Sequence, residues 1–205
     1  MAYRTVAGRA ESGFEVNGSE FVGFVAPVES VERAEAFVAD VNEAYPDARH
    51  VVPAYRVPAE GASGDDAMLR EWCSDDGEPS GSSGKPALNV LVQRDLRNVV
   101  VAVVRYKNGP NLGVGGLARA YSRAVSEAVD AAGVVEERPH ERFVAAVEYD
   151  DSGTVRGILE SADAEFEADY GERARFEVRV PTAEAAGLRD RLRSATSGRV
   201  DLDAA

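Results

Sequence analysis

The feature that most limits the possible folds of this chain is a run of six consecutive apolar residues, Val99 to Val104. Successive side chains of a strand point to opposite faces of its sheet, so an uninterrupted apolar run predicts a strand covered on both faces. Six residues are also far fewer than the roughly 20 that a membrane-spanning helix needs. We therefore expect residues 98–105 to form a central strand, with other elements packed around it.

Helix and turn patterns on both sides of this strand predict an α+β fold. Apolar residues recur at helical spacing from Val31 to Tyr45, after Ser30, a residue type that caps helices. Asn17-Gly18 is typical of a tight β-hairpin. A second helix is expected from Gly116 to Ala132, ending at Gly133. The weaker patterns predict strands over 4–16, 21–26 and 51–57, a loop over 59–66 and a helix over 87–93.

A charged segment with a proline, Glu136 to Pro139, predicts a boundary between two domains, residues 1–138 and 139–205. Beyond it, the patterns follow the order strand, helix, strand, strand, helix, strand. This βαββαβ order is that of a ferredoxin-like domain. Because a fold assigns no function by itself, two interpretations of the second domain stay open: a structural role, or a docking surface for a protein partner.

The composition excludes several classes of protein and site. With 44% hydrophobic residues, the 205-residue chain can form real cores, which excludes wholesale disorder. Cys73 is its one cysteine, which excludes an intrachain disulfide and a zinc site with several cysteines. Two histidines and scattered acids indicate no metal, and no cofactor is expected. No signal-peptide core follows Met1, so we expect a cytoplasmic protein without a membrane partner.

Charge is distributed unevenly along this acidic chain. Its net charge is −13, and Lys85 and Lys107 are its two lysines. Such a composition is typical of a salt-adapted archaeon, and an ordinary acidic protein from a GC-rich genome is the alternative. Residues 94–124 carry six basic and one acidic side chain, a net charge of 6 − 1 = +5, whereas the flanking segments are each −9. This cationic segment can bind an anion or pair with the protein's own carboxylates.

Two glycine-rich loops flank the central strand: the first glycine loop, Ser74 to Pro86, and the second glycine loop, Gly109 to Gly116. The first is long for a connection, and long loops are often functional. It is not an ATP-binding P-loop, because its glycines are wrongly spaced and Pro86 replaces the magnesium-binding hydroxyl. The second loop lacks the tight strand-turn-helix of a dinucleotide site. Its glycines can expose backbone N–H groups to an anion, or simply permit a tight turn.

We expect the two loops to meet and form one cationic site. The predicted ligand- or phosphate-binding residues are Lys85, Arg105, Tyr106, Lys107, Gly113, Gly115, Gly116 and Arg119. Tyr106 would stack on a base or pack on the sheet. Acidic residues facing a polyanion would repel it, so those of the first loop are expected to cap N–H groups or pair with Arg105 or Lys85. This loop-organising set is Asp75, Asp76, Gly77, Glu78 and Gly84.

Several motifs resemble those of the IMPACT/YigZ family. They are Pro46 to His50, Ser74 to Gly81, Gly84 to Pro86, Val103 to Tyr106, Leu112 to Leu117 and Ala120-Tyr121. The resemblance implies an N-terminal domain similar to the second domain of ribosomal protein S5-type folds, and a ferredoxin-like C-terminal domain. Eukaryotic members look like regulators of translation that act through a separate N-terminal domain. For the uncharacterised prokaryotic members, nucleic-acid or ribosome association is the usual suggestion.

Three functions are compatible with these residues. The first is a non-enzymatic RNA- or ribosome-associated binding protein with a role in the regulation of translation. The alternatives are a hydrolase that uses Asp75, Asp76 and Glu78 as base or metal ligands, and a protein-docking module. A hydrolase predicts a strongly perturbed or metal-binding carboxylate in the first glycine loop, whereas a binding protein predicts carboxylates bonded to the chain itself.

Overall fold

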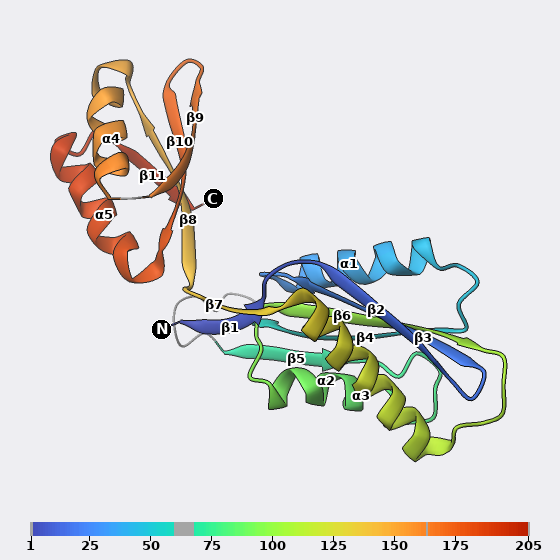
Figure 1. Ribbon diagram of the computed structural model, residues 1–205. Helices are drawn as coiled ribbons and strands as arrows, with labels where there is room; N and C mark the ends of the chain where they lie inside the picture. The colour runs from blue at the N-terminus through green and yellow to red at the C-terminus, as the bar shows by residue number, and fades with distance from the viewer. Residues whose placement is uncertain (1, 60–67, 163, 205) are drawn as a thin grey trace. The chain divides into compact units, whose positions relative to one another are not determined.

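The structure is a computed structural model that describes residues 2–59, 68–162 and 164–204 (Figure 1). The chain divides into two compact units, Ala2–Glu137 and Arg138–Ala205. Each unit combines helices with antiparallel sheets around its own apolar core, which confirms the predicted two-domain α+β architecture. The loop predicted over 59–66 lies, apart from Ala59, outside the described residues.

The first unit is built on a five-stranded antiparallel sheet with β6 at its centre. In spatial order the strands are β2 (Ala10–Val16), β3 (Ser19–Pro27), β6 (Val99–Lys107), β4 (His50–Pro58) and β5 (Leu69–Cys73). The predicted hairpin at Asn17-Gly18 joins β2 to β3, and both residues have positive φ, as a type I′ turn requires.

Helices cover both faces of this sheet (Figure 1). The helix α1 (Val31–Ala44) covers one face, and α2 (Gly84–Gln93) and α3 (Gly113–Ala132) cover the other. The apolar run of β6 divides accordingly: Val99, Val101 and Val103 pack in the core beneath α2 and α3, and the alternate residues pack beneath α1. This two-sided burial explains why the run contains no polar residue.

The position of α3 is set by a close approach to β3. A Cβ atom added to Gly23 would lie 2.4 Å from the carbonyl oxygen of Ala124, so only glycine lets the helix backbone pack this tightly on the strand. The helix begins at Gly113, three residues before the predicted Gly116, and ends at Gly133 with a positive φ, as expected. Its N-terminus therefore lies directly after the second glycine loop.

Two short strands, β5 and β7, carry no pattern that predicts them. The edge strand β5 has no buried residue, and all four residues of β7 (Val134–Glu137) are exposed. β5 pairs with the preceding strand β4, and β7 pairs with β1 (Tyr3–Val6), which overlaps the segment predicted as a strand. An exposed strand needs no alternation of apolar and polar residues.

The second unit has the element order predicted for it. Its elements are β8 (His140–Val147), α4 (Tyr149–Ser161), β9 (Glu165–Tyr170), β10 (Ala174–Pro181), α5 (Thr182–Ala195) and β11 (Asp201–Ala204). They form an antiparallel sheet in the order β11-β8-β10-β9, with both helices packed in one core. The helix α4 begins at Tyr149, and the carboxylate of Asp151 in its first turn pairs with Arg199.

Among the described helices, none is both long and apolar enough to cross a membrane.

Candidate anion-binding pocket

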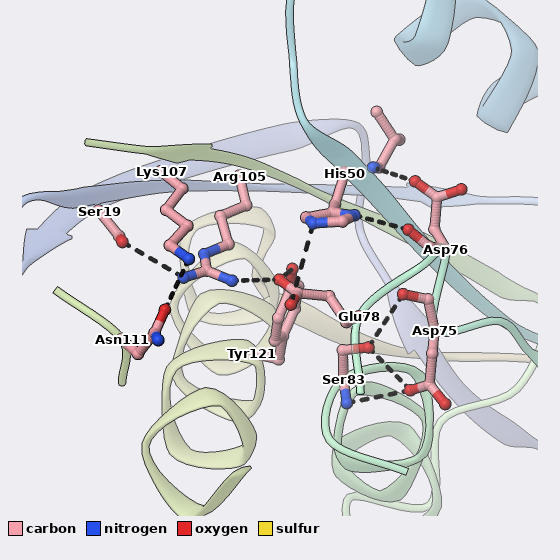
Figure 2. Close-up of polar contacts among 11 residues, drawn as sticks. Ser19, His50, Asp75, Asp76, Glu78, Ser83, Arg105, Lys107, Asn111 and Tyr121 are labelled. Carbon is pink, nitrogen blue, oxygen red and sulfur yellow. Dashed lines mark hydrogen bonds and ion pairs between the residues drawn. The ribbon is translucent and has the colours of Figure 1, made fainter. Parts of the chain in front are cut away.

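Both glycine loops contribute to one pocket of about 370 Å³ beside the end of β6. The start of β4 and the first turns of α3 complete it. The lining residues are Arg49, His50, Gly77, Glu78, Pro79, Arg105, Lys107, Asn111, Leu112, Gly113, Val114 and Leu117. Figure 2 shows the polar side chains of this region.

Asp75 organises the first glycine loop from within. Its carboxylate accepts hydrogen bonds from the Ser83 N–H at 3.1 Å and the Ser83 hydroxyl at 2.8 Å (Figure 2). It also accepts from the backbone N–H groups of Gly81 and Gly84 at 2.7 and 2.9 Å. Burial alone would raise the pKa of Asp75, but these hydrogen bonds outweigh burial and hold the pKa below its usual value. Because the donors include the first residues of α2, Asp75 also caps that helix.

Asp76 connects the first glycine loop to the start of β4. Its carboxylate accepts from the Val51 N–H at 2.7 Å, and its carbonyl oxygen lies 2.6 Å from His50 Nδ1. A carbonyl oxygen can only accept, so His50 Nδ1 carries the proton. His50 Nε2 then points toward Glu78, 3.9 Å from its Oε2 atom. The left-handed φ of Asp76 and of Gly77 makes the turn that places these groups.

A buried ion pair forms the floor of the pocket. The Arg105 guanidinium donates to Glu78 Oε1, and the Tyr121 hydroxyl donates to the same oxygen at 2.8 Å (Figure 2). The side chains of Arg105 and Glu78 are only 3% and 4% exposed. Burial, followed by the charge of Glu78, raises the pKa of Tyr121, which therefore stays a hydrogen-bond donor. Within the described part of the chain, Arg105 Nε has no hydrogen-bond partner.

The opposite side of the pocket presents donors that the chain uses only in part. Lys107 Nζ donates to Asn111 Oδ1 at 2.6 Å, and both side chains are exposed. Two of the three ammonium hydrogens and the Asn111 amide hydrogens remain available. Leu112 precedes α3 and gives no side-chain cap, so the first-turn N–H groups of the helix are uncapped there. Arg49 adds a second exposed cation.

The predicted binding residues divide into two groups. Arg105, Lys107 and Gly113 line the pocket, whereas Lys85, Gly115, Gly116 and Arg119 are not among its lining residues. Tyr106 packs against the core beneath α1, on the sheet face opposite to Arg105.

Each residue outside the pocket has a defined place. Lys85 is exposed in the first turn of α2. A Cβ atom on Gly115 would meet Arg119 Nη1 at 3.5 Å, and one on Gly116 would meet Leu112 Cβ at 3.0 Å. Gly116 therefore permits the close packing of the turn, while Gly115 faces an exposed arginine on the same helix.

The residues predicted to organise the first glycine loop contact other groups of the chain. Asp75, Asp76 and Glu78 accept hydrogen bonds from other groups of the chain. A Cβ atom on Gly84 would lie 2.5 Å from the carbonyl oxygen of Ser74, so glycine is needed for α2 to start against that residue. In the described segments there is no group of three His, Cys, Asp or Glu side chains that could hold a metal ion.

Sequence reasoning missed several residues of the pocket and its floor. His50 and Tyr121 entered only as members of family motifs, and Arg49, Asn111 and Ser19 were not predicted as site residues. Ser19 accepts a hydrogen bond from Arg105 Nη2 at 3.4 Å. A polar residue at the end of an apolar strand, as His50 and Ser19 are, is the one signal that could have indicated them.

Two family models cover most of the chain. The Impact N-terminal domain matches residues 17–129, and a domain of unknown function, DUF1949, matches residues 146–199. The chain is 31% identical to the IMPACT family member YvyE of Bacillus subtilis (strain 168) over 202 residues, which are 98% of this chain and 90% of the relative. It is 32% identical to YigZ of Escherichia coli (strain K12) over 189 residues, 92% of this chain and 90% of the relative.

Two solved structures are similar to this chain. A crystal structure described as that of a hypothetical protein is 31% identical, covers 100% of this chain and 97% of its own, and superposes with a TM-score of 0.68. A second, of the two-domain translational regulator Yih1, is 27% identical over 61% of this chain and 46% of its own. Its TM-score of 0.37 is too low to support an argument.

Proposed function

The chain belongs to the IMPACT family, and from that premise we propose that it is an RNA-binding protein, acting on free RNA or on the ribosome and contributing to the regulation of translation. The pocket of the first unit is the proposed contact for RNA phosphate groups. The translational role follows the character of the family's eukaryotic members, and the RNA contact is argued from the pocket itself.

The proposal rests on the distribution of charge at the pocket, where basic groups are available and the carboxylate is paired. The chain has a net charge of −13, yet Arg49, Lys107 and the uncapped start of α3 all line this recess. The one carboxylate that lines the pocket, that of Glu78, is buried and neutralised by Arg105. A site whose hydrogen-bond donors are available, and whose carboxylate is already paired, favours an anion.

The engaged carboxylates weigh against the hydrolase hypothesis. Asp75 and Asp76 bond to backbone N–H groups, and Glu78 bonds to Arg105 and Tyr121. A general base or metal ligand needs a lone pair directed at the substrate or ion, and these hydrogen bonds direct the carboxylates into the protein. Binding therefore explains the first glycine loop better than hydrolysis does.

We also propose finer fold assignments for the two units. In the second unit, the βαββαβ element order and the sheet order β11-β8-β10-β9 support a ferredoxin-like fold. The first unit is proposed to be similar to the second domain of ribosomal protein S5-type folds. The role of the second unit as a docking surface for a protein partner, the salt-adapted origin and the cytoplasmic location stay predictions.

The test compares two double variants that remove the same charges from different places. Arg49→Ala/Lys107→Ala removes one arginine and one lysine that line the pocket. Arg119→Ala/Lys85→Ala removes the same residue types from outside it. Binding of a short single-stranded RNA is followed by fluorescence anisotropy over a salt series. We expect the pocket variant to lose affinity and to lower the log–log salt slope by about 1.4, from roughly 0.7 for each lost phosphate contact.

The control variant should keep the affinity and salt slope of the wild-type protein. An equal loss of affinity in both variants would mean that RNA binding depends on the overall charge of the protein and not on the pocket. Absence of RNA binding by the wild-type protein would overturn the proposal.

A further inference from the structure

We infer that the pocket accepts the 5′-terminal phosphate of an RNA strand, in preference to a phosphodiester within the strand. This inference rests on the proposed function and specifies which part of the RNA the pocket recognises. It is carried by three properties of the recess: its size, its set of open donors and its apolar wall.

The size of the recess suits the end of a strand. At about 370 Å³, it is near the lower limit of roughly 300–1,000 Å³ for sites that take small molecules. We expect an internal phosphodiester to enter less readily, because the nucleotides on both sides of it would have to bend toward the same recess. A terminal phosphate enters with one nucleotide attached, and the strand leaves in one direction.

The open donors match the charge of a phosphomonoester. A terminal phosphate carries a charge of about −1.5 to −2 at neutral pH and presents three strong acceptor oxygens. Lys107 has two ammonium hydrogens beyond its bond to Asn111, and the Asn111 amide can donate while its oxygen accepts from Lys107. The uncapped first turn of α3, at Gly113 and Val114, supplies backbone N–H groups beside them.

The floor of the pocket is a buried ion pair whose charges cancel, so it does not repel an anion. Arg105 lines the recess, is 3% exposed and retains a buried Nε–H without a partner among the described residues. Its ion pair with Glu78 keeps this guanidinium fixed and removes the net negative charge that would otherwise oppose a phosphate. Arg49, at the start of β4, brings a further cation to the recess.

An apolar wall completes the fit to a nucleotide. The recess is also lined by Pro79, Leu112, Val114 and Leu117. Val114 is 58% exposed and can contact a ligand. A phosphate held by Lys107 and Asn111 would place the attached ribose and base against this wall. These aliphatic side chains form no hydrogen bonds with base edges, so the site is expected to read the end of the strand and not its bases.

The experiment uses two RNAs of identical sequence that differ only at the 5′ end. One carries a 5′-monophosphate, the other a 5′-hydroxyl, and both carry a fluorophore at the 3′ end. Their affinities are measured by anisotropy for the wild-type protein, for Lys107→Ala and for the matched control Lys85→Ala. A charge-assisted hydrogen bond contributes about 1.5–3 kcal/mol, so we expect the 5′-phosphorylated RNA to bind about tenfold more tightly or better.

Lys107→Ala should bring the ratio of the two affinities close to one, and Lys85→Ala should leave it unchanged. If both RNAs bind the wild-type protein equally and Lys107→Ala weakens both, the inference is wrong and the proposed RNA binding stands. If neither RNA binds the wild-type protein, both this inference and the proposed RNA binding are wrong.

Discussion

The two glycine loops of the first unit are both rich in glycine, but their polar groups have different partners. In the first, the carboxylates of Asp75, Asp76 and Glu78 accept hydrogen bonds from the chain itself. At the second, Asn111 accepts a hydrogen bond from Lys107 at the end of β6, and the helix that follows is left without a side-chain cap. One loop thus satisfies its polar groups internally, and the other leaves donors available at the pocket.

The comparison teaches that glycine content alone does not identify a binding loop. What separates the two loops is the state of their polar groups. Acceptors that the protein's own N–H groups already occupy stabilise the fold, whereas partly used donors beside a recess can bind a ligand. Substitutions in the first loop should therefore change stability, and substitutions in the second should change binding.

The sharpest test of this difference is removal of the buried carboxylate. Glu78→Ala leaves the Arg105 guanidinium buried without its partner, and we expect a loss of about 3–5 kcal/mol in the free energy of unfolding, measured by urea denaturation. Glu78→Gln keeps an acceptor for Tyr121 and should cost less. Lys107→Ala, an exposed residue two positions after Arg105, should change the free energy by less than about 0.5 kcal/mol. Similar values for Glu78→Ala and Lys107→Ala would remove the distinction between the loops.

A smaller loss is expected when Asp75 can no longer carry a charge. Asp75→Asn weakens the bonds to Gly81, Ser83 and Gly84, and we expect a loss of about 2–3 kcal/mol at pH 7. The folded protein lowers the pKa of Asp75, so the charged form stabilises the fold above the unfolded pKa of about 4. This contribution disappears as the pH falls through the lower, folded pKa.

The difference between wild type and Asp75→Asn should therefore be constant from pH 5 to 8 and should shrink below about pH 4. Unfolding measured over this pH range checks the sign. A difference that grows on acidification would contradict the assignment of Asp75 as a charged acceptor.

The smallest expected effects compare one glycine from each loop. A Cβ atom on Gly84 would lie 2.5 Å from a backbone oxygen of Ser74, so Gly84→Ala should destabilise the protein by about 1–3 kcal/mol. On Gly115 the nearest atom is the end of the Arg119 side chain, at 3.5 Å. Gly115→Ala should stabilise α3 by up to about 1 kcal/mol, because alanine is the better helix former. Thermal or urea unfolding of both variants measures the contrast, and loss of stability in Gly115→Ala would contradict it.

Local patterns in the sequence were sufficient to predict part of the fold. The apolar run Val99 to Val104 predicted the central strand, the period of residues 31–45 predicted α1, and Gly133 predicted the end of α3. Strands such as β5 and β7 have no such pattern. β5 forms by pairing with the edge of β4, and β7 by pairing with β1 near the N-terminus. Backbone groups make these hydrogen bonds, so the pairing leaves no pattern in the side chains.

The sequence by itself determined that one buried strand lies in a cationic segment and is flanked by two glycine loops. Only the tertiary structure decided which cations face a ligand. Alternation along β6 places Arg105 and Lys107 on the same side of the sheet, but Arg105 is neutralised by a carboxylate 27 residues away in the chain and Lys107 is not buried. Lys85, equally charged and closer in sequence to Glu78, does not line the pocket. Charge is a property of composition, whereas its availability depends on burial and on partners that only folding brings together.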